Sequence, residues 1–294
     1  MKNNNDMIQQ KSMSINTLNK ITNTFIYVFL IVLSIIWILP FIGIVLESLR
    51  CETTGMVGYI IPKQFGFDNY VRLFKSNFPK WFLNTLLMGV CVSVLQTFFV
   101  LTMSYTLSRL RFKGRKTLMN FMLILGMFPG FLTLILIYKV FADFGLTEQM
   151  APVGLIIVYC ASSGMGYYVS KGFFDTIPKS LDEAARVDGA TRWQVFYKVI
   201  MPLAKPIIIY TILMGFMAPW GDYMMARFLI NNNRDGMTVA VGMYNLINGT
   251  GDTLFHNYTM FCAAGVVVSV PVTIVFMSMQ KYYVEGVTGG AVKG

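Results

Sequence analysis

The chain has 294 residues, of which 55% are hydrophobic and only 13% are charged, and its mean hydropathy is +0.58. Soluble domains carry about 25% charged residues, so this composition excludes an ordinary soluble domain and places most of the chain in hydrocarbon. A single histidine and four cysteines without C-x-x-C spacing indicate neither a metal site nor a disulfide framework.

Six apolar stretches are long enough to cross a membrane, since a spanning helix needs about 20 apolar residues. The first is too long for a cleavable signal peptide and lacks a cleavage site, so we expect it to be retained. The fifth is interrupted by Pro219, Gly221 and Asp222. We therefore expect an all-α membrane protein whose six spans lie at about 24–46, 82–108, 117–138, 151–171, 205–229 and 258–280.

Basic residues are distributed unevenly about these spans. An even number of spans puts both termini on one side, which holds 16 of the 24 Lys and Arg residues and six acidic ones. The other side holds eight basic and eight acidic residues. Because Lys and Arg favour cytoplasmic loops, we predict that segments 1–23, 172–204 and 281–294 are cytoplasmic. Topology then accounts for the net charge of +10, and we expect no nucleic-acid partner.

The loop 172–204 has the pattern of two short helices joined by a turn. Capping boxes are expected at Ser180–Glu183 and at Thr191–Gln194, where each side chain would satisfy a free backbone N–H. Gly189 would end the first helix in a left-handed conformation, and Pro202 would end the second. An apolar face of the second helix would be formed by Trp193, Phe196 and Ile200. An amphipathic helix pair lying at the membrane surface would share these features.

The spacing within this loop is more specific. Glu183-Ala184-Ala185, then Gly189, then Pro202 resembles the EAA signature of the permease subunits of ABC importers. The family has Ile and Leu where this chain has Val199 and Met201. Segments 67–70, 81–85, 238–243 and 280–294 are similar to carbohydrate-importer permeases of the maltose type (MalG-like). The resemblance covers nearly the whole chain and implies the ABC importer permease fold.

This resemblance implies a set of contacts with a partner ATPase. The loop would be the coupling helix that docks on the ATPase, and Glu183 would pair with a basic group there. The implied coupling residues are Glu183, Ala184, Ala185, Asp188, Gly189, Ala190, Phe196 and Pro202. The tail would reach the ATPase dimer through Gly289, Gly290, Lys293 and Gly294, and a frayed end is the alternative.

The resemblance also implies the assembly. The chain would sit in a bacterial cytoplasmic membrane with a second permease subunit, two ATPase subunits and an extracytoplasmic sugar-binding protein. ATP and Mg would bind to the ATPase subunits, and this chain would bind no cofactor. The solute would be maltose, a malto-oligosaccharide or a similar oligosaccharide.

Polar residues within the spans are the candidates for contact with a solute. An ionisable residue in a span is a functional candidate, and aromatic rings stack on sugars. The substrate-pathway candidates are Asn84, Trp220, Asp222 and Tyr223, with Gln96, Ser104 and Tyr105 as weaker ones. Asp222 follows Pro206 by about 24 Å of helix, so it could instead lie at the outer interface, where Trp and Tyr are common. His256 is expected to be interfacial.

Several other functions are disfavoured by the sequence. The chain has no phosphate-binding loop with a Lys-Ser/Thr ending, and no Ser/His/Asp arrangement, so we expect that it is not an enzyme. A secondary transporter is the rival class, but the spans contain no paired carboxylates. An importer permease for another solute, such as a monosaccharide or glycerol phosphate, remains the alternative within the class.

Overall fold

The computed structural model describes residues 2–288 except 128–129, 162–163, 232 and 249–256. The described residues form helices and loops, with one isolated β-bridge between Arg50 and Phe65. The helices are α1 (Lys2–Ser48), α2 (Asp68–Lys75), α3 (Phe78–Arg109), α4 (Arg115–Gly126), α5 (Gly130–Asp143), η1 (Glu148–Met150), α6 (Ala151–Ala161), α7 (Gly164–Thr176), α8 (Ser180–Val187), α9 (Arg192–Gln194), η2 (Val195–Ile200), α10 (Met201–Leu203), α11 (Lys205–Gly221), α12 (Met224–Ile230), α13 (Val239–Ile247) and α14 (Tyr258–Thr288).

Three helices are long and apolar enough to cross a membrane. They are α1 over Asn19–Ser48, the whole of α3, and α14 over Tyr258–Lys281, and they contain the first, second and last predicted spans. Two bent pairs meet the same criterion together. One joins Leu132–Asp143 to Glu148–Ala161 at 110°, and the other joins Arg192–Leu203 to Lys205–Gly221 at 82°. The described residues therefore hold three to five candidate spans rather than the six predicted.

The predicted fifth span is divided between two helices, and the third and fourth each include two residues outside the description, 128–129 and 162–163. The range 117–138 falls on α4 and α5, 151–171 on α6 and α7, and 205–229 on α11 and α12. The fifth break does not occur at Pro219, which stays inside α11. It occurs at Asp222, whose backbone is extended and whose carboxylate accepts a hydrogen bond from the Met225 N–H in the first turn of α12.

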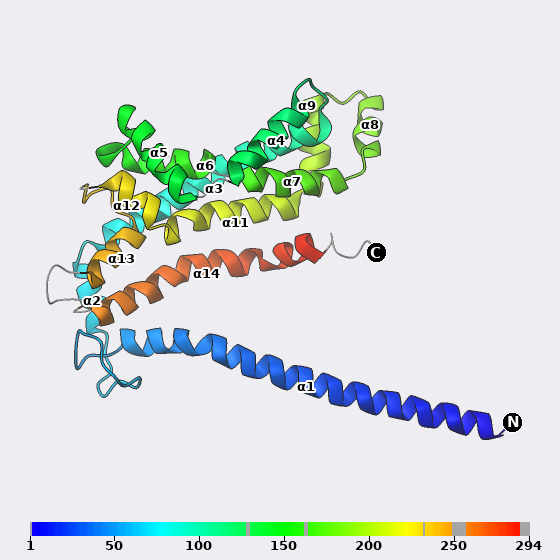
Figure 1. The fold of residues 1–294 in the computed structure, drawn as a ribbon, viewed down its shortest axis with the longest axis horizontal. Helices are drawn as coiled ribbons and strands as arrows, with labels where there is room; N and C mark the ends of the chain where they lie inside the picture. Colours follow the sequence, from blue (N-terminus) through cyan, green and yellow to red (C-terminus); the bar gives the residue numbers. More distant parts are fainter. Residues whose placement is uncertain (1, 128–129, 162–163, 232, 249–256, 289–294) are drawn as a thin grey trace.

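The centre of the bundle is the contact between α3 and α11, which lie side by side with α7 and α14 (Figure 1). Glycines allow the two backbones to approach. A Cβ added at Gly215 would lie 2.9 Å from the Ser93 Cα, and one added at Gly89 would lie 3.0 Å from the Phe216 carbonyl oxygen. Small residues at such crossings are typical of helix packing in membranes, where close van der Waals contact replaces the hydrophobic effect.

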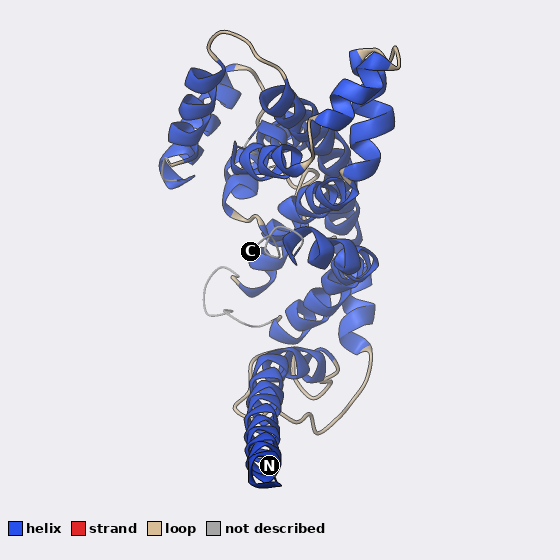
Figure 2. Cartoon of the chain, turned by 90° about the vertical axis from the view of Figure 1, so that its right-hand side faces the viewer, coloured by secondary structure: helices blue, strands red, loops and turns tan. Residues whose placement is uncertain are grey.

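Helix α1 lies outside this bundle. The most apolar stretch of its Asn19–Ser48 segment is 0% buried. Among the long helices, α1 packs only along α14 (Figures 1 and 2). Such a surface is compatible with lipid or with another membrane helix. At its end, α1 is tied to the following loop by Arg50, whose side chain is fully buried and bonds to Glu47 at 2.9 Å and to Glu52 at 2.6 Å.

The two ends of the molecule carry different elements. The start of α1, the end of α14 and helix α8 lie at one end, and α2 and α13 lie at the other (Figure 1).

Candidate functional site

The loop 172–204 folds as two helical segments joined by a tight turn. Helix α8 ends at Val187. Gly189 follows with a left-handed φ of +84°, and the Ala190 N–H bonds to the Ala185 carbonyl at 2.9 Å. Thr191 starts the second segment with a capping box: its Oγ1 accepts from the Gln194 N–H at 3.2 Å, and its own N–H donates to Gln194 Oε1 at 2.7 Å. The predicted turn and second capping box are confirmed.

Two other local predictions are wrong. The Ser180–Glu183 capping box does not form, because Ser180 is already the first residue of α8 and the Glu183 N–H bonds to the Lys179 carbonyl at 3.1 Å. The second segment also does not stop at Pro202. It passes through a π-helical stretch, η2, in which the Met201 N–H bonds to the Phe196 carbonyl, and it continues to Leu203 before the 82° bend into α11.

The inner face of the loop is packed against α3 and α7. Phe196 is buried, with its ring 4.8 Å from that of Tyr105 on α3, and the Tyr105 ring lies 6.0 Å from that of Phe174 on α7. Val195 and Ile200 are fully buried in the same cluster. Phe196 thus lies in the joint between the loop and the membrane helices, and so does Tyr105, a weaker pathway candidate.

A buried ion pair lies at this joint. The Arg109 Nε, at the last residue of α3, lies 3.2 Å from an Asp182 carboxylate oxygen in the first turn of α8, and the side chains are only 2% and 9% exposed. Arg109 Nη2 also donates to the Ile177 carbonyl at 2.8 Å. Asp182 is absent from the residues predicted from sequence. Its only signal was its position beside Glu183, because nothing in a linear sequence assigns its partner in α3.

The outer face of the loop is exposed. Glu183, Ala184, Asp188 and Gly189 are exposed, whereas Ala185 and Ala190 are half-buried. Large apolar side chains lie exposed on the same two segments: Leu181, Val187, Trp193, Tyr197 and Leu203. Trp193 was predicted to share an apolar face with Phe196 and Ile200. Its ring lies 5.4 Å from that of Phe196, but the side chain is 65% exposed, whereas Phe196 and Ile200 are buried. A surface that combines small, apolar and acidic residues on a fixed helix suits a protein partner.

The four candidates for contact with a solute make internal contacts. Asn84 donates to the carbonyls of Asp235 at 2.8 Å and Met237 at 3.0 Å, which fixes the segment before α13. Trp220 is 7% exposed and packs on Phe82.

Asp222 is engaged through both carboxylate oxygens. It accepts from the Tyr159 hydroxyl at 2.8 Å and from the Met225 N–H at 3.1 Å, while the Tyr223 ring lies 4.2 Å from that of Tyr244. In this conformation, therefore, Asp222 has a structural role at the break between α11 and α12. The tail residues Gly289, Gly290, Lys293 and Gly294, and His256, lie outside the described residues.

Comparison with known proteins gives a consistent picture. Residues 100–289 match the family described as binding-protein-dependent transport system inner membrane component. The chain is 33% identical to the maltodextrin transport system permease protein MdxG of Bacillus subtilis, over 94% of this chain and 97% of that protein. It is 31% identical to the galactooligosaccharides transport system permease protein GanQ of the same organism, over 92% and 95% of the two chains. It is also 31% identical to the maltose/maltodextrin permease protein MalG of Salmonella typhimurium, over 98% and 99%.

The fold is also that of a solved transporter chain. A chain of a bacterial ABC transporter involved in the import of the acidic polysaccharide alginate superimposes with a TM-score of 0.75. The alignment covers 90% of this chain and 97% of that one, at 24% sequence identity. At this identity the likeness concerns the fold alone.

Proposed function

The chain belongs to the family of binding-protein-dependent transport system inner membrane components, and we propose that it is one permease subunit of an ATP-driven oligosaccharide importer. It would form half of the translocation pathway in a bacterial cytoplasmic membrane. The solute class rests on the relatives, which are named for maltodextrin, maltose and galactooligosaccharides. Malto-oligosaccharides are the first solutes to test, and another sugar or glycerol phosphate is the alternative.

We infer that the outer face of the 172–204 loop docks on an ATPase subunit. The observation that carries this proposal is the division of the loop into two faces. Its inner face is fixed to α3 by Phe196 and by the Arg109–Asp182 pair, while its outer face presents Glu183 and exposed apolar side chains. A rigid element anchored on one side and open on the other can transmit a displacement from a partner to the bundle.

The proposed mechanism follows from these contacts. ATP, with Mg, would bind to two partner ATPase subunits and draw them together. Helix α8 would move with the ATPase, and the buried pair would pull the end of α3, which packs against α11 at the centre of the bundle. Access to the pathway would then alternate between the two sides, with an extracytoplasmic binding protein delivering the sugar. In this proposal the chain crosses the membrane six times, both termini are cytoplasmic, and a second permease subunit completes the pathway.

Charge reversal on the exposed face tests the docking proposal. Glu183→Lys, alone and with Gly189→Trp, should release the ATPase from the membrane-inserted complex. The lysine inverts the charge at the contact, and the tryptophan distorts the turn. Asp143→Lys is the matched control, since Asp143 is also exposed but lies at the end of α5. Co-purification of the ATPase with both variants at wild-type yield would overturn the assignment.

Transport tests the solute class separately. Vesicles containing the complete importer should accumulate labelled maltotriose in the presence of ATP, and the Glu183→Lys variant should not. Accumulation of a labelled monosaccharide or of glycerol phosphate, with no uptake of maltotriose, would move the solute to the alternative class while leaving the docking proposal intact.

A further inference from the structure

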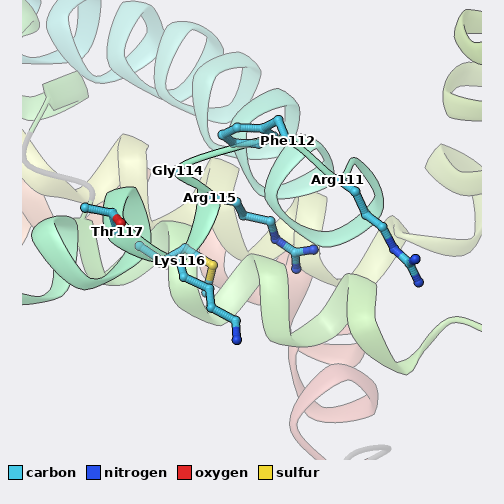
Figure 3. A pocket seen from close by; sticks show the side chains of 7 residues that line it. Arg111, Phe112, Gly114, Arg115, Lys116 and Thr117 are labelled. Carbon is cyan, nitrogen blue, oxygen red and sulfur yellow. The ribbon is translucent and has the colours of Figure 1, made fainter.

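A basic cavity lies at the junction between α3 and α4, next to the coupling loop but separate from its exposed face. It has a volume of about 600 Å³ and is lined by Arg111, Phe112, Gly114, Arg115, Lys116, Thr117 and Met119. Figure 3 shows the charged ends of Arg111, Arg115 and Lys116 extending toward the same side of the loop. No acidic side chain lines this cavity.

The positive charge is not neutralised within the described chain. None of the ion pairs found there includes Arg111, Arg115 or Lys116. Arg115 acts electrostatically on Asp175, but that carboxylate is already bonded to Lys171 and Ser108. Two of the three cations are in the first turn of α4, where the helix dipole disfavours positive charge. An anion in the cavity would offset this unfavourable positive charge.

An apolar groove lies further along α3 and α4, separated from the cavity by a gap with no room for a water molecule. Met119 lines both the cavity and a narrow gap beyond it, and Met122 and Tyr167 line both that gap and the groove. The groove has a volume of about 500 Å³. Its walls are formed on α3 and α4 by Phe99, Met103, Phe121, Met122 and Leu125. It exists because α4 packs against α7 and leaves a space beside α3.

A basic cavity with an apolar groove beside it is complementary to one class of molecule. We propose that this site binds an anionic phospholipid, with its phosphate between Arg111, Arg115 and Lys116 and an acyl chain along the groove. Basic clusters beside membrane helices attract anionic headgroups. The apolar groove is what selects a lipid over a soluble phosphate, because burial of each CH₂ group adds to binding. The proposal is independent of the transported solute.

Native mass spectrometry of the complete importer tests this site. The complex is mixed with phosphatidylglycerol and phosphatidylcholine of identical acyl chains, and the lipids retained per complex are counted. The wild-type complex should retain phosphatidylglycerol in preference to phosphatidylcholine. Arg115→Gln and Lys116→Gln should each lower that preference about fivefold, the contribution expected of one basic residue near an anionic lipid.

Lys113→Gln is the matched control, because Lys113 belongs to the same loop but does not line the cavity. It should lower the preference much less than Arg115→Gln. Met122→Trp, which fills the groove, should lower the retention of both lipids. An equal loss in the Lys113 and Arg115 variants would mean diffuse attraction only. Two further results would overturn the proposal. One is displacement of the bound lipid by millimolar glycerol 3-phosphate. The other is that the variants lose a protein subunit from the complex rather than the lipid.

Discussion

The Nε of Arg109 at the end of α3 lies 3.2 Å from a carboxylate oxygen of Asp182 at the start of α8, and both side chains are buried. The neighbouring residue, Glu183, is exposed, because adjacent residues of a helix point in directions about 100° apart. Two adjacent acids therefore face different partners: one is held by the membrane bundle and one is open to another protein. This difference yields a direct comparison by mutation.

Asp182→Asn should weaken the packing of α8 on α3 by about 3–5 kcal/mol, because it leaves the buried Arg109 without its counter-ion. Glu183→Gln, at an exposed position, should change stability by less than about 0.5 kcal/mol. Limited proteolysis of the 172–204 loop and thermal unfolding of the purified complex measure both effects. Equal effects of the two variants would mean that the ion pair does not hold the loop.

Gly189→Ala should cost about 1–2 kcal/mol, the penalty for an L-residue in the left-handed conformation. Steric overlap does not contribute, because a Cβ at Gly189 would meet nothing within 4 Å. Gly172→Ala is the control: it also has open space around it but lies within α7 at an ordinary φ, so it should be neutral or stabilising. The difference in thermal stability between the two variants checks the backbone argument.

Gly215→Ala should destabilise the α3–α11 contact by about 1–3 kcal/mol, since the added methyl would lie 2.9 Å from the Ser93 Cα and the two backbones must separate. Gly43→Ala, in the exposed α1, has nothing within 4 Å of the added Cβ and should have little effect. Unfolding of the two variants in detergent gives the comparison. A stable Gly215→Ala protein would contradict the close approach of these helices.

The loop after α1 should respond to acid through Glu52. Burial acts to raise the pKa of Glu52, but hydrogen bonds from the N–H groups of Lys63 and Gln64 and from Arg50 outweigh it and lower the pKa to about 2. Because the pKa in the folded state is below the ordinary value of 4.5, its stabilising effect is complete above that value. It is lost as the pH falls toward 2.

Hydrogen exchange of residues 49–67 between pH 7 and pH 2 measures this effect, after correction for the intrinsic exchange rate. Glu52→Gln should show at pH 7 the weakened protection that wild type shows only at the acid end. Wild-type protection that disappears near pH 5 would contradict the depressed pKa. Asp68→Asn, on the adjacent α2, is the control and should leave the protection of this loop unchanged.

The sequence was sufficient where the determining interactions are local. Apolar runs longer than 20 residues predicted α1, α3 and α14, because hydropathy acts residue by residue along a helix. The turn at Gly189 and the capping box at Thr191 were predictable for a similar reason: each depends on neighbouring residues only. The order of Glu183, Gly189 and Pro202 was enough to identify the class of protein, as the family match confirms.

Tertiary structure alone decided which polar and aromatic residues face inward. The partner of Asp182 lies on α3, and the partners of Asn84 precede α13, so neither pairing has a signature in the spacing of residues. The same holds for Asp222, whose bond to Tyr159 turns a candidate for substrate contact into a structural residue of this conformation. Local sequence sets where helices form. Contacts between helices depend on how their faces meet, because a buried charge or hydroxyl requires a partner wherever packing places it.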